Sequence, residues 1–138
     1  MFVEIKSQPA RDFIASLMAT KRLLLAPRIA RIDTLALKIF ETVNSDPSLP
    51  SIDPPEAYAL ALAAHVSAPL LTDNAAPKLA VAYIVELRGT RVLDSLDVLA
   101  LLYGREELQS RVNEFMQDTG LVFSRRRLEE YGLRPREG

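Results

Sequence analysis

The sequence contains no cysteine and no tryptophan, and its single histidine is His65. Without cysteine the chain forms no disulfide, holds no metal through thiolates and has no thiol nucleophile. A single histidine also excludes zinc sites built mainly from imidazoles. Any bound metal would therefore be held by carboxylates, a ligand set that suits Mg²⁺ and Mn²⁺.

The chain also has little net charge and no long hydrophobic run. The formal net charge is −1, so binding to nucleic acid would need a local basic patch. The longest uncharged run, residues 57–72, is interrupted by His65, Ser67 and Pro69 and falls short of the roughly 20 apolar residues of a membrane-spanning helix. The first residues lack the basic lead and apolar run of a signal peptide. We expect a cytoplasmic protein without a membrane segment.

Apolar patterns of two kinds alternate along the chain. Helical spacing covers residues 10–19, 28–43, 54–66, 75–87, 95–103, 105–118 and 124–131, and short β-prone runs cover residues 2–5, 23–25, 70–72 and 90–93. Such alternation favours parallel strands joined by right-handed crossovers. The sequence therefore predicts one α/β domain over residues 1–138, a three-layer α/β/α sandwich with a central parallel sheet of about four to five strands. Residues 121–138 are expected to form a short C-terminal helix and a frayed tail.

Two acids follow from this pattern as site candidates. Glu56 lies in the first turn of the helix over residues 54–66, and Asp73 directly follows the strand over residues 70–72. Ligands of open α/β sheets bind beyond the carboxyl ends of the strands, so the two carboxylates are expected to face each other there. A local alternative exists, because Asp53 and Glu56 also form a capping box in which each acid only caps the helix.

Residues 56–63 and 70–74 resemble the core signature of PIN domains, in which an acid opens a helix of small apolar residues and a strand then ends in Leu-Thr-Asp. Residues 92–99 are similar to the following strand and hydroxyl-bearing turn, and residues 108–128 to the C-terminal part of a prokaryotic PIN subgroup. The resemblance implies a parallel-sheet nuclease that cleaves single-stranded RNA with Mg²⁺ or Mn²⁺. Many such proteins are toxins that pair with an antitoxin.

The resemblance implies that Asp73, Glu56 and Asp33 are the catalytic and metal-binding residues. The sequence also departs from the family. Lys6 stands where the first strand usually ends in Asp, and Asn74 stands where a second Asp is common. A lysine would repel a metal or put its own ammonium in place of the cation. The alternative function is therefore a catalytically degenerate PIN-like domain that serves as an interaction or oligomerisation module.

Cations and hydroxyls are the groups that contact phosphates. The candidates for contact with nucleic acid are Lys6, Ser95, Arg125, Arg126 and Arg127. Because Glu129 and Glu130 follow within a turn, the three arginines could instead belong to a solvated helix face.

The remaining titratable positions have structural explanations. His65 is expected to be a partly buried spacer, and Asp94 and Asp97 are expected to cap the next helix. The apolar helix faces exceed what one domain of this length usually hides, which predicts a homodimer. The third alternative is an unrelated small α/β protein whose acids only cap helices.

Overall fold

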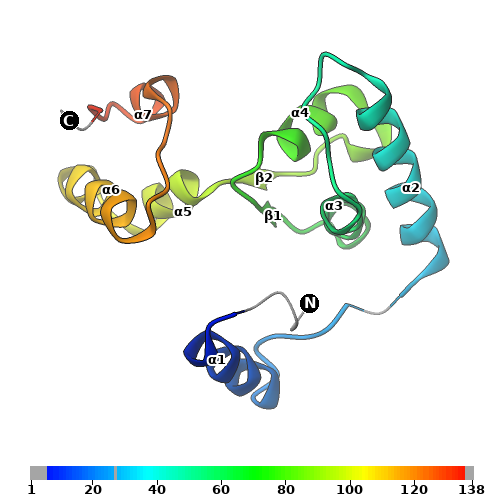
Figure 1. The fold of residues 1–138 in the computed structure, drawn as a ribbon, viewed down its shortest axis with the longest axis horizontal. Helices are drawn as coiled ribbons and strands as arrows, with labels where there is room; N and C mark the ends of the chain where they lie inside the picture. The colour runs from blue at the N-terminus through cyan, green and yellow to red at the C-terminus, as the bar shows by residue number, and fades with distance from the viewer. Residues whose placement is uncertain (1–5, 27, 136–138) are drawn as a thin grey trace.

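The structure is a computed structural model that describes residues 6–26 and 28–135. None of the helices in this part of the chain has the length and apolar content needed to cross a bilayer. In chain order the elements are α1 (Gln8–Ala19), α2 (Ala30–Ser45), α3 (Pro54–Val66), β1 (Leu70–Leu71), α4 (Ala75–Tyr83), the 3₁₀ helix η2 (Val85–Leu87), β2 (Val92–Leu93), α5 (Ser95–Leu102), α6 (Arg105–Thr119) and α7 (Arg125–Glu130) (Figure 1).

β1 and β2 form a parallel pair in which Leu70 lies opposite Val92 and Leu71 opposite Leu93. They are the only strands within residues 6–26 and 28–135. The predicted three-layer sandwich with four to five strands is therefore wrong, because helices make up most of the described chain. The predicted strand over residues 23–25 is exposed and joins no sheet, since a short apolar run does not by itself specify a pairing partner. The predicted strand over residues 2–5 lies outside the described residues.

The predicted helix over residues 75–87 is two elements. α4 ends at Tyr83, and Ile84 takes an extended backbone with φ −101° and ψ 116° before η2 begins. β-branched residues such as Ile84 and Val85 lose side-chain freedom in a helix. The break also buries Ile84 and Leu87, so packing outweighs the helical pattern here.

The larger apolar core lies between α2, α3, α4 and η2. On α2 the buried residues Ile32, Ala36, Ile39 and Val43 recur at three and four residues, as the predicted amphipathic helix requires. Small residues on α3 and α4 let these helices approach closely. The other buried members of this α2–α4 core are Ile52, Ala57, Leu60, Ala61, Ala76, Ala80, Ile84 and Leu87.

A second, smaller core holds α5, α6 and α7 together on the other side of the strand pair (Figure 1). The Phe115 and Phe123 rings stack with centroids 5.9 Å apart, which packs the segment before α7 onto α6. The buried members of this α5–α7 core are Leu96, Leu108, Val112, Phe123, Leu128 and Leu133.

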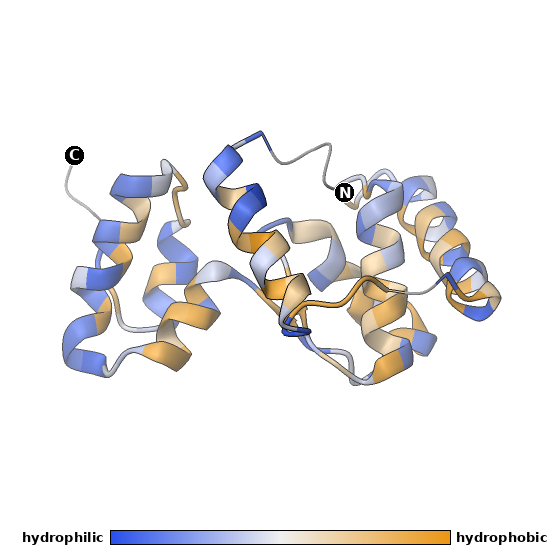
Figure 2. Cartoon of the chain, turned by 90° about the horizontal axis from the view of Figure 1, so that it is seen from below, coloured by the Kyte–Doolittle hydropathy of each residue, from blue (hydrophilic) through white to orange (hydrophobic). Residues whose placement is uncertain are grey.

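Residues 6–26, here called the N-terminal arm, belong to neither core. α1 starts where the Ser7 hydroxyl accepts a hydrogen bond from the Ala10 N–H at 3.5 Å, and none of its residues is buried. The first buried residues of the two cores, Ile32 and Leu96, both lie after the arm. Figure 1 shows α1 set apart from both groups of helices, and Figure 2 shows hydrophobic colour along α1 and the segment after it.

Candidate carboxylate site

α3 opens with the predicted capping box. The Asp53 carboxylate accepts a hydrogen bond from the Glu56 N–H at 2.8 Å, and the Asp53 N–H donates to Glu56 Oε2 at 3.3 Å. Pro54 occupies the first helical turn, where its missing N–H leaves no helix bond unmade. The expected capping roles of Asp53 and Glu56 are confirmed.

The other oxygen of Glu56 contacts the loop that follows β1. Asn74 Nδ2 donates to Glu56 Oε1, and the Asn74 N–H donates to Thr72 Oγ1 at 3.2 Å. Asn74 directly follows Asp73, so the end of β1 lies beside the start of α3. An amide donor carries no net charge, so this contact leaves the negative charge of Glu56 uncompensated.

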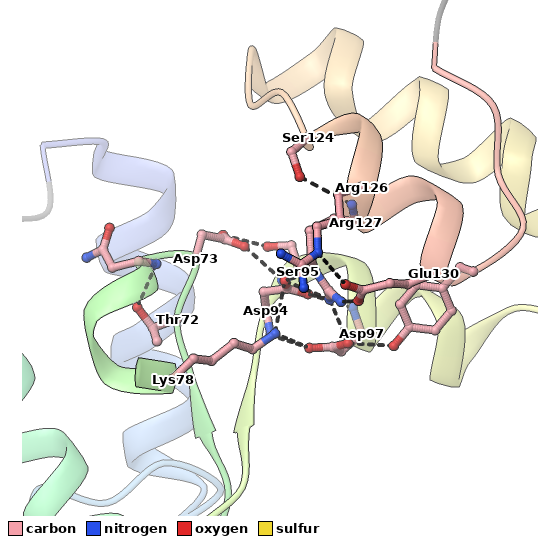
Figure 3. Close-up of polar contacts among 12 residues, drawn as sticks. Thr72, Asp73, Lys78, Asp94, Ser95, Asp97, Ser124, Arg126, Arg127 and Glu130 are labelled. Atoms are coloured by element: carbon pink, nitrogen blue, oxygen red, sulfur yellow. Dashed lines mark hydrogen bonds and ion pairs between the residues drawn. The ribbon is translucent and has the colours of Figure 1, made fainter. Parts of the chain in front are cut away.

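Asp73 is bound by Ser95. Its Oδ1 accepts the Ser95 N–H at 2.8 Å, and its Oδ2 accepts the Ser95 hydroxyl at 2.7 Å (Figure 3). Ser95 opens α5 just beyond β2, so the two hydrogen bonds join the carboxyl ends of the two strands. No hydrogen bond links Asp73 to Glu56 in the described part of the chain. The predicted neighbours are instead connected indirectly, through Asn74.

Asp33 lies in the first turn of α2, where a negative charge favours the helix dipole. Its carboxylate pairs with the exposed Arg28 at 3.2 Å. Among residues 6–26 and 28–135, no group of three acidic, histidine or cysteine side chains is placed to hold a metal ion. The roles of Asp33, Glu56 and Asp73 as metal ligands stay a prediction, as does metal-dependent ribonuclease activity.

A second capping box opens α5, as expected for Asp94 and Asp97. Asp94 Oδ1 accepts the Asp97 N–H at 2.9 Å, and Asp97 Oδ2 accepts the Asp94 N–H at 2.8 Å. Both carboxylates also contact the ammonium of Lys78 on α4, at 3.3 Å and 3.1 Å. The two acids therefore connect α5 to a helix of the α2–α4 core.

Arg127 on α7 contacts the same two acids (Figure 3). Its Nε and Nη2 donate to the two oxygens of Asp94 at 3.0 Å each, and Nη2 also donates to Asp97 Oδ1 at 2.8 Å. The Tyr131 hydroxyl donates to the same Asp97 oxygen, and the guanidinium lies 5.6 Å from the Tyr131 ring centre. Lys78, Asp94, Asp97, Arg127 and Tyr131 form what we call the Asp94 network.

The contacts within the Asp94 network shift the pKa values of three of its residues. Burial raises the pKa of Asp97, but the hydrogen bonds from Tyr131, the Asp94 N–H, Arg127 and Lys78 outweigh burial and bring this pKa well below its usual range. Burial lowers the pKa of Arg127, but the contacts of Arg127 with Asp97 and Asp94 outweigh burial, so the net shift of this pKa is upward. Burial and the bond to Asp97 both raise the pKa of Tyr131. All three shifts favour the charged network with a protonated tyrosine.

The other nucleic-acid candidates lie outside this network. Arg125 pairs with Glu129 at 2.8 Å, and Arg126 approaches Glu130 at 4.0 Å, both on the exposed face of α7. These pairs match the alternative of a solvated helix face. Lys6 is exposed, and contact of any of these residues with RNA stays a prediction.

The sequence carried a signal for the Asp94 network that its local interpretation missed. Two acids three residues apart on one helix repel each other unless a cation lies nearby, so Asp94 and Asp97 indicated a basic partner. That partner, Arg127, is 33 residues away, and spacing cannot identify it. His65, expected to be partly buried, is exposed in the last turn of α3.

We compared the chain with protein-family models, with curated proteins and with solved structures, and none of the three comparisons gave a significant match.

Proposed function

We propose that this protein is an interaction module that self-associates through its N-terminal arm. One observation carries the proposal, namely the large apolar side chains that the arm exposes within a single chain. Phe13 is 62% exposed, Leu24 is 74% exposed and Leu25 is 61% exposed. Large exposed apolar side chains that gather on one segment are typical of protein–protein contact sites.

The physics of α1 supports a partner for this surface. The helix has 12 residues, a length at which isolated helices are marginal in water and depend on packing of their apolar face. Phe13, Ile14, Leu17 and Met18 form such a face by their spacing. Ile14, Leu17 and Met18 are half-buried and Phe13 is exposed, and neither core contains any of the four. We therefore assign the partner of the exposed part of this face to another molecule.

Charge complementarity favours a second copy as that partner. The N-terminal arm, residues 6–26, contains four Lys and Arg and one Asp, which gives +3, while residues 27–138 contain 13 Lys and Arg and 16 Asp and Glu, which gives −3. The arm of one copy is therefore attracted to the body of another. Reciprocal exchange of identical arms is a common route to two-fold symmetric dimers.

An apolar cleft beside β1 supplies a receiving surface. The cleft has a volume of about 410 Å³, and its apolar lining residues are Leu71, Val98, Leu99, Leu102 and Phe115. Asp73 and Asp94 also line it. In the arm, Lys21 and Arg22 directly precede the apolar residues 23–25, so one docked arm would present leucines to the cleft and cations to its acids.

Sedimentation equilibrium of the full chain tests this assignment. We expect a dimer whose dissociation constant rises about 1,000-fold in Leu24→Asp, because both arms of the symmetric dimer lose a leucine and burial of each leucine contributes about 2 kcal/mol. Leu37→Asp is the matched control, since Leu37 is 57% exposed on α2 and lies outside both the arm and the cleft. A wild-type chain that stays monomeric, or equal weakening by both variants, would overturn the proposal.

Complementation between two variants identifies the receiving surface. Leu102→Asp changes the cleft, where Leu102 is 69% exposed, and should weaken the dimer as Leu24→Asp does. In an equimolar mixture, the Leu102→Asp chain has an intact arm and the Leu24→Asp chain has an intact cleft. We therefore expect a heterodimer in which one of the two arm–cleft contacts is restored. Absence of heterodimer formation would show that the arm binds elsewhere.

A further inference from the structure

A separate pocket lies where the two strands begin, at the end of the sheet opposite Asp73. Its volume is about 250 Å³. The Leu70 N–H donates to the Arg91 carbonyl at 2.9 Å, so the loops that precede β1 and β2 are held side by side. The pocket is lined by Ala64, Ser67, Ala68, Pro69, Arg88, Gly89, Thr90 and Arg91.

The charge of this pocket is one-sided. Arg88 and Arg91 are both exposed and line it, and no acidic residue does. Within the described residues, neither guanidinium has an ion-pair or hydrogen-bond partner. By contrast, Arg28, Arg111 and Arg125 each pair with a carboxylate. Two unpaired arginines at one pocket create a positive potential with nothing in the pocket to neutralise it.

Neutral donors lie among the same lining residues. The side-chain hydroxyls of Ser67 and Thr90 have no hydrogen-bond partner in the described part of the chain. Gly89, with φ +86°, turns the second loop, and the Thr90 N–H is bonded to the Leu87 carbonyl at 2.9 Å. Phosphate oxygens accept hydrogen bonds from guanidinium groups and hydroxyls, and a nearby carboxylate would repel them. The groups that line this pocket therefore suit a phosphate.

We propose that this pocket binds the phosphate group of a small phosphomonoester. Pockets for drug-sized ligands begin at about 300 Å³, so a pocket of about 250 Å³ suits a phosphate with a short carbon substituent. Arg88 and Arg91 supply charge, and Ser67 and Thr90 supply neutral hydrogen bonds. None of these residues belongs to the N-terminal arm or to the cleft beside β1, so the site is independent of self-association.

A titration followed by NMR tests the site in the full-length chain. Glycerol phosphate is the probe, and glycerol is the uncharged control. We expect saturable shifts of the Gly89 and Thr90 amide signals with glycerol phosphate and none with glycerol. Arg91→Gln should raise the dissociation constant about tenfold, because it removes a charged donor.

Arg105→Gln provides the matched control. Arg105 is exposed and lines a different pocket, which also contains Glu130, so its loss should leave the affinity for glycerol phosphate unchanged. Equal weakening by Arg105→Gln and Arg91→Gln would reveal non-specific attraction and overturn the proposal. So would binding of a single-stranded oligonucleotide at these amides without any response to glycerol phosphate.

Discussion

The two helices that open with capping boxes, α3 and α5, use the same local chemistry in different surroundings. In both, an aspartate accepts the N–H three residues on, and an acid at that position accepts the N–H of the aspartate. Asp53 is exposed, whereas the Asp94 side chain is only 15% exposed and the Asp97 side chain 13%. Cations from two other helices contact the α5 box, whereas within residues 6–26 and 28–135 the side-chain partner of the α3 box from outside it is the neutral amide of Asn74.

This difference gives the two boxes different structural roles. Lys78 comes from α4 of the α2–α4 core, and Arg127 comes from α7 of the α5–α7 core. The α5 box therefore joins the two cores, while the α3 box starts a helix and contacts Asn74 beside the end of β1. A motif that is complete within four residues sets where a helix begins, and charges distant in sequence decide whether it also holds tertiary structure.

The largest expected effect comes from Arg127→Ala. The substitution leaves Asp94 and Asp97 close together and partly buried, with Lys78 as the one cation that contacts them among the described residues. Loss of one partner from a buried pair costs about 3–5 kcal/mol, and solvent screening at a side chain that is 24% exposed reduces this to about 2–3 kcal/mol. Urea unfolding measures the loss. Arg125→Ala, which removes an exposed pair on the same helix, should cost about 0.5 kcal/mol or less.

The second largest expected effect is a loss of stability at low pH that depends on Asp97 of the α5 box. Because the pKa of Asp97 is lowered in the folded chain, its stabilising effect is present above the unfolded pKa of about 4 and is lost as the pH falls further. Asp97→Asn should cost about 2 kcal/mol at pH 7. Its stability should then fall less steeply than that of the wild type between about pH 4 and pH 2. If chemical unfolding showed that the free energy of unfolding falls equally steeply with pH in the wild type and in Asp97→Asn, a special role for Asp97 would be contradicted.

How far the sequence predicts the molecule depends on the distance over which its signals act. The α3 cap could be predicted because Asp53, Pro54 and Glu56 contain all of its determinants. The amphipathic pattern of α2 also predicts its buried face, since Ile32 and Ile39 recur with the helical period. Local patterns of this kind gave the helices but not their arrangement.

Features that depend on distant partners could not be predicted in the same way. Residues 23–25 have the composition of a buried strand, yet a strand requires a neighbour, and the described part of the chain pairs none with them. The contact between Asp73 and Ser95 spans 22 residues and depends on the parallel pairing of β1 with β2. Two strands of two residues are too short to be distinguished from loops by alternation.

The smallest expected effect tests whether the α3 box does more than cap. Glu56→Gln keeps an oxygen that can accept the Asp53 N–H, so the free energy of unfolding should change by about 0.5 kcal/mol or less. Calorimetric titration with millimolar Mg²⁺ or Mn²⁺ should give the same heat for variant and wild type. Asn74→Ala is the companion variant, because it removes the neutral partner of Glu56 and keeps its charge. A metal response that Glu56→Gln abolishes and Asn74→Ala preserves would make Glu56 a ligand, and the contrast between the two boxes would then be one of metal against arginine as the source of positive charge.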